Sequence, residues 1–364
     1  MRDQEHFEVL DGLRGIAALL VLVFHVSEVF TGGVPARNLL PHGALAVDFF
    51  FCLSGFVVAH AYDHRWAQGM TLGSFALRRL VRLHPMVVLA TALGTAVWLL
   101  DPFGSTAHHV SGGQLALTIG LALFLLPYPA LPDRGSDTHS LDGPTWTLFQ
   151  EYVGNIAYAL VLHRLSQRVL LALIVVAACA TLATAWHYGT LAVGYGWGHM
   201  WAGFVRLAFP FLAGIWIRRA LSSLPAHRAG LWPLSAMLLA AFALPVWAIG
   251  GSKEANGLLH AGLVILLFPA LILLGAHSRI PPRTLAASRF LGRLSYPLYI
   301  LHHPLIYVFK DYVARGNPDP KITAIIAILL PLGLIALAWA ALRLWDEPLR
   351  GWLTARLLPR NKGR

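Results

Sequence analysis

The sequence predicts an all-α integral membrane protein of about ten transmembrane helices in one bundle, and two observations carry that prediction. Of its 364 residues, 57% are hydrophobic and only 12% are charged. Soluble domains carry about 25% charged residues, because their surface faces water. The apolar residues also gather in runs of about 20, the length that a helix needs to cross the hydrocarbon core. Much of the surface is therefore expected to face lipid.

Eleven apolar runs follow one another along the chain, and we expect each to form a helix. The run 114–127 falls short of the roughly 20 residues required to cross the membrane, so we interpret it as a dipping or interfacial helix. Ten spans remain. The eleven runs are 13–30, 44–62, 84–100, 114–127, 145–162, 169–187, 198–217, 232–250, 257–276, 291–310 and 321–345.

The distribution of basic residues predicts that both termini are cytoplasmic. If 114–127 does not cross, 21 of the 28 Lys and Arg residues fall on the cytoplasmic side and six outside, with Arg206 inside a span. Cytoplasmic loops of membrane proteins carry such an excess of positive charge. A full crossing by 114–127 would move the basic loop 279–293 outside. We therefore expect a membrane domain over 1–350 and a basic cytoplasmic tail over 351–364.

Composition and motifs also exclude several functions. The net charge of +11 is spread in short clusters between apolar runs, which argues against a nucleic-acid surface. Both cysteines, Cys52 and Cys179, lie within apolar runs and predict neither a disulfide framework nor a zinc site. The sequence has no HExxH motif, glycine-rich phosphate loop or GxSxG elbow, so no metal is expected.

Two ionisable residues on the first span, Arg14 and His25, are expected to face the interior of the bundle. Eleven helical steps return to within about 20° of the same face, about 16 Å further along the axis. Ionisable groups in a bilayer are costly unless they have partners. Arg14 also suits an ordinary cytoplasmic anchor, and His25 suits a packing role between helices.

The second span begins with an acid, Asp48, and contains the pair Ser54 and Gly55. An acid just inside the external end of a span needs a basic partner or water. A serine and a glycine in a membrane helix also permit close packing of neighbouring helices. The pair therefore has a structural interpretation as well as a functional one.

Arg79 and Arg82 precede Pro85 at the start of the third span and share one face of a helix. Two guanidiniums at the cytoplasmic surface suit a polyphosphate, because each forms forked hydrogen bonds to anionic oxygens. Binding of lipid headgroups explains the same pair.

Two later spans also carry polar residues where burial is costly. Glu151 lies in an apolar helix, and Arg206, inside the seventh span, is a candidate partner for it. A structural Glu–Arg pair would explain both residues. Near the C-terminus one helix face, at i, i+4 and i+7, carries Ser295, Tyr299 and His302.

Five segments, in order and spanning nearly the whole chain, resemble the membrane acyltransferase-3 family. One local departure is His84, which stands where the family usually has an aromatic residue. The segments are Arg14 to His25 for R-x10-H, Asp48–Gly55 for F-F-x-L-S-G, Arg79–Pro85 for R-x-x-R before a proline, Trp146–Glu151 for W-[ST]-L-x-x-E, and Ser295–His302 for S-Y-x-x-Y-x-x-H.

The family transfers acyl groups, often acetyl, from cytoplasmic acyl-CoA to hydroxyls of surface polysaccharides and related acceptors. The resemblance therefore implies an O-acyltransferase of the bacterial cytoplasmic (inner) membrane, surrounded by lipid. Acyl-CoA, with acetyl-CoA first among candidates, would be the co-substrate, and a glycan or other sugar-bearing molecule the acceptor.

With this resemblance, we expect His25 to act as the general base that takes a proton from the acceptor hydroxyl. Asp48 or Glu151 would orient the imidazole and stabilise its charged form. The donor would be bound by Arg14, Arg79 and Arg82. The residues expected at the substrate are Ser54, Trp146, Arg206, Tyr299 and His302.

A covalent route is an alternative mechanism, in which Ser54 or Cys52 accepts the acyl group before passing it on. An acyl-histidine is a further form of the same route. The sequence does not separate these from direct transfer.

A proton-coupled transporter or flippase is the alternative function from another class. It explains buried ionisable groups equally well, but it gives no reason for the paired arginines or the five ordered motifs. Its proton relay would consist of Arg14, His25, Glu151 and Arg206.

Overall fold

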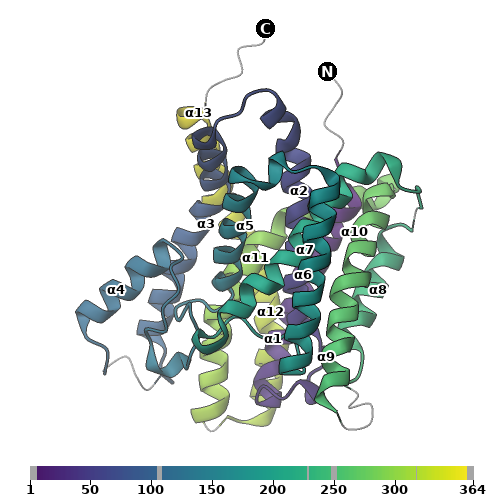
Figure 1. Cartoon of the computed structure of the whole chain (residues 1–364). Helices are drawn as coiled ribbons and strands as arrows, with labels where there is room; N and C mark the ends of the chain where they lie inside the picture. Colours follow the sequence, from purple (N-terminus) through teal and green to yellow (C-terminus); the bar gives the residue numbers. More distant parts are fainter. Residues whose placement is uncertain (1–5, 105–108, 228, 247–251, 317, 359–364) are drawn as a thin grey trace. The chain divides into compact units, whose positions relative to one another are not determined.

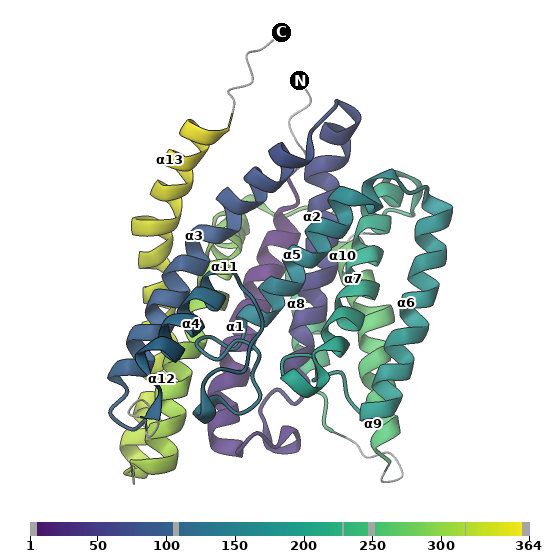
Figure 2. The same cartoon turned by 60° about the vertical axis from the view of Figure 1, so that its left-hand side comes forward.

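The computed structural model describes residues 6–104, 109–227, 229–246, 252–316 and 318–358. In these residues the regular secondary structure is helical, and only two isolated β-bridges occur beside it (Figures 1 and 2). Each of the eleven predicted apolar runs coincides, at least in part, with helix. The predicted all-α class is therefore confirmed.

Among the described residues, six helical stretches are long and apolar enough to cross a membrane, which makes the protein a polytopic membrane protein. The run predicted to stay on one side forms α4 (Gly112–Leu123), a helix of 12 residues. It covers about 18 Å, against a hydrocarbon core of about 30 Å. The six stretches are Glu8–Thr31, Gly43–Ala67, Leu72–Leu100, Gln167–Tyr188, Lys253–His277 and Pro320–Leu357.

The chain divides into two compact units, of which unit 1 consists of Met1–Asp63, Gln150–Gly194 and His199–Tyr296. Within it α6 packs against α7 and α9, and α1 packs against α8 and α10. A π-helix, Leu263–Leu267, joins α9 to α10. Its helices are α1 (Glu8–Thr31), most of α2 (Ala46–Ala67), α6 (Gln167–Tyr188), α7 (Trp201–Ala220), α8 (Leu231–Ala243), α9 (Lys253–Gly262) and α10 (Phe268–His277).

Helices α2 and α7 approach each other closely at two glycines. A Cβ atom on Gly55 of α2 would overlap the carbonyl oxygen of Phe211, and one on Gly214 of α7 would overlap that of Cys52. Small residues allow this approach of two helix backbones in a membrane. The structural interpretation of Gly55 is confirmed, and the neighbouring Ser54 is thereby brought next to other helices.

Unit 2 consists of His64–Phe149, Tyr195–Gly198 and Pro297–Arg364. Its helix α3 (Leu72–Leu100) packs against α4 and against α13 (Glu347–Leu357), which lies beside it in both views (Figures 1 and 2). A π-helix, Leu342–Asp346, joins α12 (Pro320–Ala341) to α13. Two further helices contribute residues to both units, α5 (Thr145–Leu160) and α11 (Pro282–Arg315).

The C-terminal part of the chain is helical for longer than its apolar run. Helix α13 ends at Leu357, so the predicted boundary at residue 350 lies inside it. Positions 359–364 of the predicted basic tail lie outside the described residues. The segment between α4 and α5 contains a short 3-10 helix, Pro132–Arg134, and its Leu131 and Leu141 pack against Trp98 of α3.

Candidate active site

The predicted base, His25, lies on α1 in unit 1 and contacts a carboxylate one turn further along the same helix. Its ring Nδ1 is 3.0 Å from Oε2 of Glu28. A carboxylate only accepts hydrogen bonds, so Nδ1–H donates and Nε2 carries the lone pair that takes up a proton. The side chains are 19% and 39% exposed. Sequence reasoning missed Glu28, although its i, i+3 spacing from His25 was a usable signal.

Asp48 forms a sealed ion pair with Arg206 in the same unit. Nε and Nη2 of Arg206 donate to the two carboxylate oxygens at 3.2 and 2.6 Å. The side chains are 0% and 2% exposed. Arg206 also donates to the carbonyl oxygens of Val193 and Ala44 at 2.8 and 2.9 Å. The pair therefore connects the start of α2 and the segment before α7.

Glu151 accepts a hydrogen bond from a motif residue of another helix. The hydroxyl of Ser54 on α2 donates to its Oε1 at 3.1 Å. Arg206, predicted as a partner of Glu151, has its ion pair with Asp48. Sequence spacing alone does not show which acid a buried arginine meets, because it does not give the rotation of each helix.

Arg14 connects α1 to α11 within unit 1. Its Nε donates to Oγ of Ser295 at 2.9 Å, and its Nη2 donates to the carbonyl oxygen of Gly292 at 2.6 Å. The same Nη2 is 3.1 Å from Oδ1 of Asp11. These contacts bring the first and last of the five motifs together. They also occupy much of the guanidinium that was expected to bind the donor.

Three of the predicted substrate residues belong to unit 2, where α5 meets α11. Trp146 is buried beside Thr147, whose hydroxyl donates to the carbonyl oxygen of Pro144. The phenol of Tyr299 therefore donates to Thr147, at 2.9 Å. The buried ring of His302 donates from Nδ1 to the Tyr299 carbonyl oxygen at 2.8 Å, so its Nε2 carries the lone pair. The motifs of α5 and α11 thus meet in space.

The two predicted donor-binding arginines on α3 differ in their exposure to solvent. Arg79 is buried and Arg82 is exposed, although both belong to the same face of the helix. The described residues hold no group of three or more His, Cys, Asp or Glu side chains arranged to bind a metal ion.

Comparison with known proteins identifies the family. The model of an acyltransferase domain matches residues 7–343. The chain belongs to this family. It is therefore a membrane enzyme that transfers acyl groups, as the five motifs predicted. No solved structure matches it.

Three bacterial proteins are similar to this chain over part of its length. Protein 2 in the picA locus of Rhizobium radiobacter is 40% identical over 164 residues, which are 43% of this chain and 82% of that protein. A protein of Staphylococcus aureus (strain COL) named for O-acetyl transfer is 38% identical over 96 residues, 25% of this chain and 14% of its own length. A protein of Bacillus subtilis (strain 168) named for peptidoglycan O-acetyl transfer is 24% identical over 330 residues, 85% of this chain and 50% of its own length.

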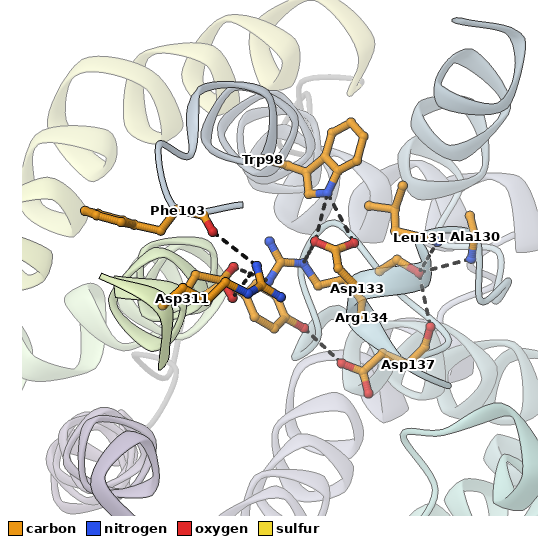
Figure 3. A network of polar contacts seen from close by, with 11 residues as sticks. Trp98, Phe103, Ala130, Leu131, Asp133, Arg134, Asp137 and Asp311 are labelled. Carbon is orange, nitrogen blue, oxygen red and sulfur yellow. Dashed lines mark hydrogen bonds and ion pairs between the residues drawn. The ribbon is translucent and has the colours of Figure 1, made fainter. Parts of the chain in front are cut away.

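A polar network in unit 2 of the acyltransferase was not predicted from the sequence (Figure 3). The Arg134 guanidinium lies 3.8 Å from the centre of the Tyr307 ring and 3.8 Å from Oδ2 of Asp311. Asp133, 3.6 Å from Arg134, accepts from the indole N–H of Trp98 at 3.3 Å. This network attaches the segment between α4 and α5 to α3 and α11. Its members are scattered over more than 200 positions, so spacing gave no signal.

Asp142, at the end of the same segment, differs from the acids of this network in its hydrogen bonding. The residue is 3% exposed, and neither carboxylate oxygen has a hydrogen-bond partner among the residues that the structure describes. Burial raises the pKa of the Asp142 carboxyl well above its usual range. In the acyltransferase this carboxyl lies shortly before the helix that carries Glu151.

Proposed function

We propose that this acyltransferase moves an acetyl group from cytoplasmic acetyl-CoA to a hydroxyl of a cell-envelope carbohydrate. The observation that carries the proposal is the His25–Glu28 pair, which has the geometry of a general base with an orienting carboxylate. The names of two relatives, which refer to O-acetyl transfer, support the acetyl group. The name of the Bacillus relative supports a peptidoglycan-like acceptor.

The chemistry follows from that pair. Nε2 of His25 takes the proton of the acceptor hydroxyl while the oxygen attacks the thioester carbonyl carbon. Glu28 stabilises the imidazolium that forms. The tetrahedral intermediate then expels the CoA sulfur, which receives the proton from His25 and leaves as the free thiol. General base catalysis of this kind contributes about 10²–10⁴-fold.

The remaining motif residues take supporting roles in this proposal. Arg79 and Arg82 bind the phosphates of the donor at the cytoplasmic side. Arg14 and the Asp48–Arg206 pair act as positioning residues, since their polar atoms are already bonded to the protein. Positive charge concentrated on one side of the predicted spans supports cytoplasmic termini and a place in the cytoplasmic membrane.

The acceptor side of the site is assigned to the α5–α11 contact. Trp146, Tyr299 and His302 combine an indole, a phenol and an imidazole, which are groups that bind sugar rings and hydroxyls. The hydrogen bond between Thr147 and Tyr299 supports a fixed orientation of the phenol.

Direct transfer is preferred over a covalent route. Ser54 has a base partner in Glu151, which is the arrangement that an acyl-serine route would use. Its neighbour Gly55, however, packs directly against the backbone of α7, which fixes this part of α2 in place. Cys52 is fully buried. These surroundings suit a structural hydrogen bond better than the entry of a thioester.

The transporter alternative receives less support. A proton relay needs groups that exchange partners along a path. Arg206 and Asp48 are bonded through both oxygens, and Arg14 is bonded to α11.

Acetyl transfer by membranes that contain the protein tests the proposal. Membranes are supplied with radiolabelled acetyl-CoA, and alkali-labile label in the envelope carbohydrate is measured. The variant His25→Gln is expected to lose about 10²–10⁴-fold in rate. The matched control is His227→Gln, an exposed histidine on the segment after α7. Equal transfer by wild type and His25→Gln would overturn the assignment of the base.

A further inference from the structure

The C-terminal π-helix and α13 are fitted onto the arginine-bearing part of α3. The indole N–H of Trp345 donates to the carbonyl oxygen of Pro85 at 2.8 Å. The next residue, Asp346, is 1% exposed. Its Oδ2 is 3.2 Å from Nη2 of Arg350 on α13, and its carboxyl also interacts electrostatically with Arg82 of α3. One buried carboxylate therefore lies between two guanidiniums from different helices.

The charges at this place do not balance. Arg78 and Arg79 stand one turn before Arg82 on α3, at i, i+4 and i, i+3, and α3 packs against α13. The acids beside these arginines are Asp346 and Glu347, and Glu347 is already paired with Arg343. The Nε atoms of Arg78 and Arg350 are inaccessible to solvent and have no acceptor among the described residues. Buried N–H groups without an acceptor are costly, and guanidiniums bind anionic oxygens in preference to others. An anion with several oxygens satisfies both conditions.

We propose that Arg350 of α13 completes, with Arg79 and Arg82, a three-guanidinium site for the phosphates of the nucleotide donor. Asp346 is the positioning residue, because its Oδ2 pairs with Arg350 and its charge attracts Arg82. The π-helix supplies this register, since it turns Trp345 and Asp346 toward the Arg82–Pro85 turn. CoA carries a pyrophosphate and a separate 3′-phosphate. Two arginines cannot bind all of these phosphate groups, so a third guanidinium is needed. The identity of the donor rests on the proposed function.

The site is tested by binding, without turnover. The full chain carrying His25→Ala is purified in detergent, and CoA and pantetheine, which lacks the phosphates, are titrated by calorimetry. Arg350→Gln is expected to weaken CoA binding about tenfold or more and to leave pantetheine binding unchanged. Arg350→Lys keeps the charge but cannot donate two parallel hydrogen bonds to one phosphate. It should therefore bind CoA more tightly than Arg350→Gln but less tightly than the parent. Asp346→Asn is expected to weaken CoA binding less than Arg350→Gln.

The matched control is Arg356→Gln, on the same helix, whose guanidinium lies 4.8 Å from the centre of the Trp352 ring. It should leave CoA binding unchanged. Equal CoA affinity for Arg350→Gln and its parent would overturn the proposal. So would a loss that appears only in binding of phosphatidylglycerol vesicles, because the phosphates would then belong to lipid headgroups. Acetyl transfer by the same variants with His25 restored is measured separately, so failure of the enzyme proposal and failure of this site remain distinguishable.

Discussion

Two acid–base pairs in unit 1 have opposite environments. Asp48 and Arg206 are sealed from solvent, and the arginine also donates to two backbone carbonyls. His25 and Glu28 are hydrogen-bonded to each other and remain partly exposed. Removing one partner of a sealed pair leaves a buried charge uncompensated, whereas a partly exposed pair can exchange a proton with its surroundings. Exposure to solvent, rather than charge alone, separates the positioning pair from the candidate catalytic pair.

The largest effect is expected from breaking the sealed pair. Arg206→Met leaves a buried carboxylate uncompensated and should cost about 3–5 kcal/mol of stability. Unfolding of detergent-solubilised protein, followed by temperature and size exclusion, measures this loss. The double variant Asp48→Leu with Arg206→Met should recover most of it, since no charge is then left alone. Asp63→Asn is the matched control, because that carboxylate pairs with Arg219 while 31% exposed. An equal loss for the control would remove the contrast between sealed and open pairs.

The open pair should affect rate more than stability. Glu28→Gln keeps the shape but removes the charge that stabilises the imidazolium, a charged hydrogen bond of about 1.5–3 kcal/mol. Acetyl transfer should fall about 10- to 100-fold with little change in unfolding temperature. Glu254→Gln, on α9, serves as the control for loss of one glutamate. A rate within twofold of wild type would deny Glu28 its role.

Much of the fold could be predicted from the sequence, because a helix that crosses the hydrocarbon core must be apolar over about 20 residues. Apolar runs of sufficient length predicted the helices, and the short run 114–127 predicted the short α4. The ends of the runs were less accurate, since helices continue past the hydrocarbon core. Helix α11, for example, begins at Pro282, before the apolar run at 291–310.

The sequence predicted which residues belong to the candidate site, but not which of them contact each other. Cost of burial pointed to Asp48, Glu151 and Arg206, but it does not give the rotation of each helix. That rotation decides that Arg206 pairs with Asp48 and that Ser54 bonds Glu151. Contacts over long separations, such as Arg134 with Asp311, leave no local pattern at all.

A third pair, Ser54 and Glu151, is partly buried like His25 and Glu28, but its hydrogen bond joins two helices, α2 and α5. If its hydrogen bond is structural, Ser54→Ala should cost about 1 kcal/mol of stability and leave acetyl transfer within a few-fold of wild type. Unfolding temperature and transfer rate are measured on the same preparation. Cys52→Ala, two residues earlier on α2, tests the other candidate acyl acceptor in the same way. Abolished transfer, together with loss of label trapped on the wild-type protein, would favour the covalent route instead.

Asp142 extends the comparison to a carboxyl with no hydrogen-bond partner among the described residues, and its expected effect is the smallest. In an unfolded chain the carboxyl loses its proton near pH 4, whereas burial raises the pKa in the folded protein. Between those two pKa values the unfolded chain binds fewer protons, so this group lowers stability as pH rises. Asn has a similar shape and no titrating proton. Asp142→Asn should therefore unfold at nearly the wild-type temperature below about pH 4 and at a higher temperature at neutral pH.

Asp133→Asn is the matched control for this pH dependence, because that carboxylate accepts from Trp98 and pairs with Arg134. Its replacement removes bonds to the ionised form and should lower the unfolding temperature at neutral pH. The two substitutions in one segment therefore have opposite expected signs. If Asp142→Asn also destabilised the protein at neutral pH, the carboxyl would be ionised and paired, and burial without a partner would no longer distinguish it from Asp48.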